Sequence, residues 1–129
     1  MPELPPFDQR AGIAVALDVV VVAIFTLVGR MTHDQPFAIG GWLHTAWPFV
    51  IGLLVGWALV ATRGRIWPTR VGPGITVWVS TLVIGMLLRA LSGQGTAFSF
   101  IIVATLFLGV TLVGWRVGLE ALERRRLES

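Results

Sequence analysis

The sequence predicts an all-α integral membrane protein, a bundle of four transmembrane helices. Of the 129 residues, 55% are hydrophobic and only 13% are charged, whereas soluble domains usually carry about a quarter charged residues. Four apolar runs each approach the roughly 20 residues that a helix needs to cross the hydrocarbon core of a bilayer. Stretches rich in glycine and proline separate these runs, and such residues interrupt helices.

The chain divides into a short tail, one membrane domain and a second tail. We expect an N-terminal tail over residues 1–10 and a helical tail over 119–129. Asp18 interrupts the first run and no clear cleavage signal follows it, so we expect a retained helix and not a signal peptide. The four predicted spans are residues 11–29, 43–61, 75–91 and 98–118.

The arginines predict how the bundle lies in the membrane. All ten basic residues are arginines. With four spans both termini lie on one side, which then holds eight arginines, while the other side holds only Arg30 and Arg89. Because positive charge gathers in cytoplasmic segments, we expect a multi-pass protein of the cell (inner) membrane with both termini cytoplasmic.

Two segments of the chain are alike. Phe49 to Trp57 reads FVIGLLVGW and Phe107 to Trp115 reads FLGVTLVGW, and five of the nine positions are identical. The chain therefore looks like two tandem helical hairpins, related by a pseudo-twofold axis along the membrane normal. A chance likeness between two apolar segments is the alternative.

Asp18 is the most unusual residue of the predicted spans. It lies about seven residues into the first helix, roughly 10 Å deep, where a carboxylate is costly and must face the bundle interior. Trp57, Trp78 and Trp115 lie at a similar depth and can donate hydrogen bonds to it, and Arg116 can reach inward. Asp18 is then either a proton- or cation-binding acid or a hydrogen-bonded acid that fixes helix packing.

Arginines at both membrane faces are the second group of candidates. Arg30 and Arg89, with His33 nearby, can form an anion-binding site, because the planar guanidinium donates hydrogen bonds in pairs. The alternative is that both only reach interfacial water. On the cytoplasmic side the loop before the third helix is expected to contact lipid headgroups, or only to set orientation. Its arginines are Arg63, Arg65 and Arg70.

Metal, cofactor and enzyme functions find little support. The chain has no cysteine, and His33, Asp34 and His44 match no metal-ligand spacing. Neither a phosphate-binding loop nor a catalytic motif occurs. We therefore expect no metal, no cofactor and no enzymatic activity.

Eight short stretches resemble a family of small prokaryotic membrane proteins, domain-of-unknown-function family 3054. The resemblance covers nearly the whole chain and implies a multi-spanning membrane protein, but no activity. The stretches are LDVVVVAIF (from Leu17), GRMTH (from Gly29), TAWPF (from Thr45), Gly56–Trp57, GITVW (from Gly74), GMLLRAL (from Gly85), GTAFSFIIVAT (from Gly95) and GWR (from Gly114).

Two functions remain open at this stage. The first is a small transporter or ligand-binding membrane protein that uses Asp18 with Arg30 and Arg89. The second is a structural or accessory subunit of a membrane complex, or a lipid-binding protein without transport activity. Membrane lipids are the expected partners, with a homo-oligomer or a larger complex as a further possibility, and nucleic acid is not expected because the arginines lie at the ends of apolar runs.

Overall fold

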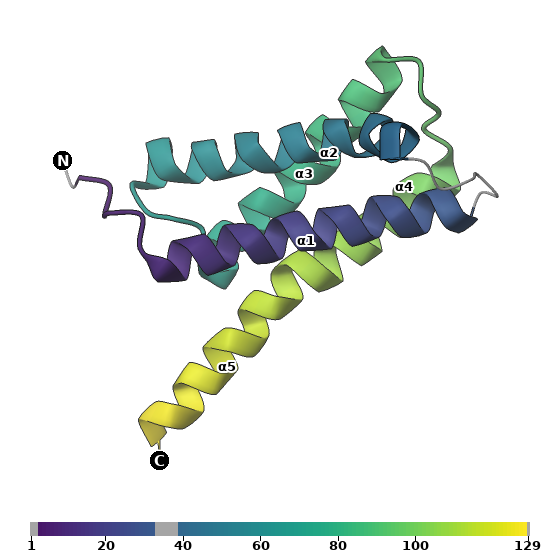
Figure 1. Cartoon of the computed structure of the whole chain (residues 1–129). Helices are drawn as coiled ribbons and strands as arrows, with labels where there is room; N and C mark the ends of the chain where they lie inside the picture. The colour runs from purple at the N-terminus through teal and green to yellow at the C-terminus, as the bar shows by residue number, and fades with distance from the viewer. Residues whose placement is uncertain (1–2, 33–38, 129) are drawn as a thin grey trace.

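The computed structural model describes residues 3–32 and 39–128, with only the backbone described for residues 30–32. Within these ranges all regular structure is helical. Four helical rods follow one another, and Figure 1 shows both termini on the side of the molecule away from the α3–α4 connection. Each rod is long and apolar enough to cross a membrane, so the predicted all-α fold with four apolar helices is confirmed.

The helices extend beyond most of the predicted spans. The first rod is α1 (Gln9–Thr32) and the third is α3 (Val71–Leu91). Two rods contain a π-helical turn. The second consists of α2 (Ile39–Leu59) and η1 (Val60–Gly64), and the fourth of α4 (Phe98–Leu108), η2 (Gly109–Val113) and α5 (Gly114–Glu128).

Local hydrogen bonds explain where the helices begin and end. The Asp8 Oδ1 atom accepts a hydrogen bond from the Ala11 amide at 2.9 Å and caps the start of α1, as short polar side chains do at helix N-termini. At the start of α3 the Val71 amide donates to Glu120 of α5 at 3.1 Å. The end of α3 turns at Gly93, whose φ of 81° favours glycine.

Glycines allow α2 and α3 to pack backbone against backbone. A Cβ atom on Gly52 would lie 2.9 Å from the Thr81 Cα atom, and one on Gly56 would lie 3.0 Å from the Val77 Cα atom. The Ser80 hydroxyl donates to the Gly52 carbonyl at 2.8 Å across this contact. Such close approach is the usual role of small residues between membrane helices.

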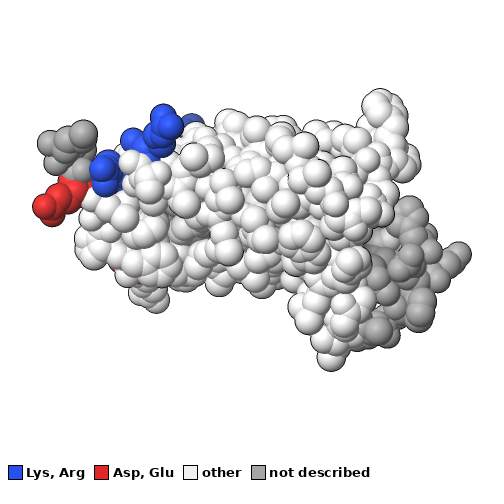
Figure 2. All heavy atoms as spheres, turned by 90° about the horizontal axis from the view of Figure 1, so that it is seen from above, with Lys and Arg blue, Asp and Glu red and all other residues white. Residues whose placement is uncertain are grey.

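The outside of the bundle is apolar, as a lipid-facing surface must be. Apolar side chains on the outward faces of the rods stay exposed, among them Val20 at 51%, Val83 at 50% and Val103 at 56%. Figure 2 shows one face on which the charged side chains gather at one end and leave the rest of the described surface without charge. This pattern is typical of a protein embedded in a bilayer.

The fourth rod packs less tightly than the others at its C-terminal end. Figure 1 shows α5 slanting away from α1. Nothing lies within 4 Å of a Cβ atom built on Gly114 or Gly118, in contrast to Gly52 and Gly56. The two glycine pairs thus differ. Gly52 and Gly56 allow α2 to contact α3, whereas Gly114 and Gly118 of α5 face open space.

The glycine contact can be tested by substitution. We expect Gly52→Ala to lower the stability by about 1–3 kcal/mol, because the added methyl group overlaps the backbone of α3. Thermal unfolding of the purified protein in detergent measures the effect. Gly114→Ala is the matched control and should be neutral or stabilising, because alanine favours the helix; equal destabilisation by both would contradict the packing.

Candidate functional site

Asp18 lies fully buried at the centre of a cluster of polar side chains. We call Asp18, Trp57, Trp115 and Arg116 the Asp18 cluster. The Trp57 indole donates to Oδ2 at 2.9 Å, and the Trp115 indole donates to Oδ1 at 2.9 Å. The Arg116 guanidinium donates to Oδ1 at 2.9 Å and to Oδ2 at 2.7 Å. Each carboxylate oxygen therefore accepts two hydrogen bonds, which fills the roughly four acceptor positions of the group.

The hydrogen-bond donors of Arg116 are all used as well, and its side chain is fully buried. Besides its paired bonds to Asp18, it donates through Nε at 3.0 Å and Nη2 at 2.7 Å to the Pro68 carbonyl, and through Nη1 at 2.9 Å to the Leu112 carbonyl. These bonds use all five N–H groups of the guanidinium. Its Cζ atom also lies 4.3 Å from the centre of the Trp115 ring.

Gly74 makes room for this side chain. A Cβ atom on Gly74 would overlap the Arg116 Cδ atom, so the arginine crosses α3 where that helix has no side chain. The Asp18 cluster thereby joins α1, α2 and α5 to the segment between η1 and α3. Among the described residues, the donors and acceptors of Asp18 and Arg116 are all used within this network.

Trp78, which was predicted to lie near Asp18, bonds elsewhere, and so do two threonine hydroxyls. Trp78 donates to the Thr105 carbonyl at 3.1 Å and packs against Gly109. The hydroxyls of Thr81 and Thr111 donate to carbonyls of their own helices. Trp57 and Trp115, which occupy equivalent positions in the two similar segments, bind the two oxygens of one carboxylate. The internal repeat itself stays a prediction.

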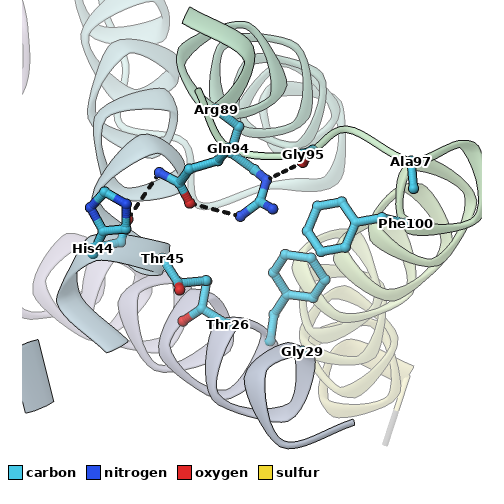
Figure 3. A pocket seen from close by; sticks show the side chains of 10 residues that line it. Thr26, Gly29, His44, Thr45, Arg89, Gln94, Gly95, Ala97 and Phe100 are labelled. Atoms are coloured by element: carbon cyan, nitrogen blue, oxygen red, sulfur yellow. Dashed lines mark hydrogen bonds between the residues drawn. The ribbon is translucent and has the colours of Figure 1, made fainter. Parts of the chain in front are cut away.

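A pocket of about 430 Å³ opens at the end of the bundle where α3 ends. We call it the Arg89 pocket, because the Arg89 side chain reaches into it between Gln94 and Phe100 (Figure 3). The guanidinium donates through Nε to the Gly95 carbonyl at 3.0 Å and through Nη1 to Gln94 Oε1 at 3.1 Å. Its Cζ atom lies 4.5 Å from the centre of the Phe100 ring. The remaining lining residues are Phe25, Thr26, Gly29, His44, Thr45 and Ala97.

Aromatic rings lie between the Arg89 pocket and the Asp18 cluster. The Phe25 ring centre lies 5.2 Å from that of Phe49, 5.9 Å from that of Phe100 and 5.5 Å from that of Phe107. Phe25 follows Asp18 by seven residues, or roughly 10 Å along the helix. The pocket thus ends on packed rings, well before the buried carboxylate.

The other predicted site residues are placed as follows. Arg30 belongs to α1, but its side chain lies outside the described part of the chain, as does His33. Arg63, Arg65 and Arg70 are exposed near the loop before α3, and Arg70 forms a 3.5 Å ion pair with Glu120. Among the described residues no group of three or more potential metal ligands comes together.

Two contributors to the Asp18 cluster had no distinct signal in the sequence. The Pro68 carbonyl is a backbone group, and Gly74 is one of two closely spaced glycines, with Gly72, in the first turn of α3. Arg116 carried a partial signal: it directly follows Trp115 and is the arginine nearest to the end of the predicted fourth span. The paired geometry that connects it to Asp18 follows only from the fold.

We expect Asp18→Asn to destabilise the protein by about 3–5 kcal/mol, because Arg116 stays buried without its counter-charge. Thermal unfolding in detergent measures the loss. The double variant Asp18→Leu with Arg116→Met removes both charges and should lose less stability than the single variants Asp18→Leu and Arg116→Met combined. Strict additivity of the two single effects would contradict the coupling.

Comparison with known proteins identifies a family. A family model described as "Protein of unknown function (DUF3054)" matches residues 15–119. No match was found among curated proteins or among solved structures. The matched range includes all four residues of the Asp18 cluster and all ten described residues of the Arg89 pocket. The chain therefore belongs to the DUF3054 family.

Proposed function

We propose that this protein is a small ligand-binding protein of the membrane, and that its ligand is an anion held in the Arg89 pocket. The observation that carries the proposal is the half-buried Arg89 guanidinium, which lines a pocket of about 430 Å³. That volume lies in the range of known small-molecule sites. Arginine suits carboxylate and phosphate groups because its fork donates parallel hydrogen bonds.

Asp18 then serves stability and not transport. A proton-carrying carboxylate must exchange its proton with a path, but both oxygens of Asp18 are bonded to Arg116 and to an indole. The aromatic rings around Phe25 separate it from the Arg89 pocket. These two features favour ligand binding over coupled transport.

The arginine distribution supports an orientation for the pocket. We place the two termini in the cytoplasm, so that the Arg89 pocket opens on the outer side of the cell (inner) membrane. On the other side Arg63, Arg65 and Arg70 then meet lipid headgroups, which attract arginines near the cytoplasmic leaflet.

A second candidate is an accessory role in a membrane complex. The open surface beside Gly114 and Gly118 on α5 favours it, because small residues let a partner helix approach. This candidate requires no ligand in the Arg89 pocket.

Anion binding is tested by thermal unfolding in uncharged detergent with acetate, phenylacetate or inorganic phosphate added. At a ligand concentration of about 100 Kd, binding stabilises the folded state by about 2.7 kcal/mol. We expect at least one anion to raise the Tm of the native protein and of Arg63→Gln, but not of Arg89→Gln. If every anion changes the Tm of all three proteins by the same amount, specific binding at Arg89 is excluded and the accessory role is favoured.

The orientation is tested with single cysteines, because the chain has none of its own. Ser92→Cys places a thiol beside the Arg89 pocket, and Glu128→Cys places one at the end of α5. A membrane-impermeant maleimide should label Ser92→Cys on intact cells, and Glu128→Cys only after permeabilisation. The reverse pattern would place the pocket in the cytoplasm.

A further inference from the structure

The hydrogen-bond donors of the Arg89 pocket are few. Arg89 has five N–H groups, and two of the donor atoms bond to neutral acceptors of the following loop, Gly95 O and Gln94 Oε1. Among the described residues no carboxylate pairs with Arg89. Its positive charge therefore lacks a counter-charge in the described part of the pocket.

The neighbouring polar side chains are mostly committed to the protein. The Thr26 hydroxyl donates to carbonyls of its own helix and accepts from the Trp42 indole at 3.0 Å. The Thr45 hydroxyl donates to the Gly41 carbonyl, and the Gln94 amide donates to the His44 carbonyl. Arg89 is thus the one cation of the described lining, joined only by the exposed imidazole of His44.

The rest of the lining is apolar. The rings of Phe25 and Phe100 and the small residues Gly29 and Ala97 offer surface for a hydrocarbon or aromatic group. The Phe100 ring also lies beneath the guanidinium, so the charged and apolar surfaces adjoin. Figure 3 shows Arg89 and Phe100 side by side on one wall, opposite Thr26 and Gly29.

We propose that the ligand is an amphipathic monocarboxylate, whose carboxylate pairs with Arg89 and whose apolar body lies against Phe25 and Phe100. This inference rests on the proposed function of anion binding at the same pocket. A single guanidinium matches one planar carboxylate in charge and in shape. A phosphate dianion would leave one charge and several oxygens without donors, and burying such groups is costly.

The test is titration calorimetry on the purified full-length protein in uncharged detergent. Phenylacetate is the probe, phenylacetamide is its neutral counterpart of the same shape, and inorganic phosphate is the competing anion class. We expect phenylacetate to bind at least about tenfold more tightly than either. A factor of ten corresponds to about 1.4 kcal/mol, which a charge-assisted hydrogen bond supplies.

Variants separate the two parts of the ligand. Arg89→Gln should abolish phenylacetate binding, and Arg89→Lys should weaken it about tenfold, because lysine keeps the charge but lacks the paired donors. Phe100→Ala should weaken phenylacetate binding more than acetate binding. Arg63→Gln is the matched control for charge, and unfolding without ligand shows that each variant is folded.

The outcomes distinguish this inference from the proposed function. If phosphate binds through Arg89 and phenylacetate does not, the monocarboxylate is excluded while anion binding stands. Equal affinity for phenylacetate and phenylacetamide would mean that the pocket binds only the apolar part of the ligand, and it would overturn the inference. If no anion binds in an Arg89-dependent way, both proposals fail together.

Discussion

The pairing of one carboxylate with one guanidinium in an apolar interior is the constraint on which this fold depends. Neither charge can stay alone at that depth, because an unpaired buried ion costs several kcal/mol. Asp18 and Arg116 come from the first and last rods, and their seven hydrogen bonds leave neither side chain with an unfilled donor or acceptor site. The indoles, the Pro68 carbonyl and the gap at Gly74 all serve to complete this one pair.

Arg116 and Arg89 both reach into the bundle, but they bond to different kinds of acceptor. Each lies against an aromatic ring, Arg116 at 4.3 Å from the Trp115 ring centre and Arg89 at 4.5 Å from the Phe100 ring centre. Arg116 meets an internal carboxylate, whereas the acceptors of Arg89 in the described residues are a neutral amide and a neutral carbonyl. The same stacking geometry therefore accompanies an ion pair at one end of the bundle and, among the described residues, a cation with neutral partners at the other.

The sequence was sufficient for the helices and for a set of candidate partners of Asp18, but not for the choice among these candidates or for their geometry. Apolar runs of about 20 residues leave a chain in lipid few alternatives to helices, so the four rods were predictable. Trp57 and Trp115 were predictable as donors from their depth, whereas Trp78, at a similar depth, points to Thr105 because rotation about the helix axis decides direction. The Arg89 pocket was predicted only as an anion-binding site of Arg30 and Arg89 with His33 nearby, because its walls depend on how α1, α2, α3 and α4 meet.

The separation of Asp18 and Arg116 along the chain has a consequence for biosynthesis. The residues are 98 positions apart, and chains are made and folded from the N-terminus. The first helix therefore enters the bilayer with an acid whose partner has not yet been translated. Until the last helix arrives, that carboxylate lacks the guanidinium that pairs with it in the folded protein. The ion pair can therefore form only after the last helix has been made, and a chain truncated before Arg116 would leave Asp18 without its counter-charge.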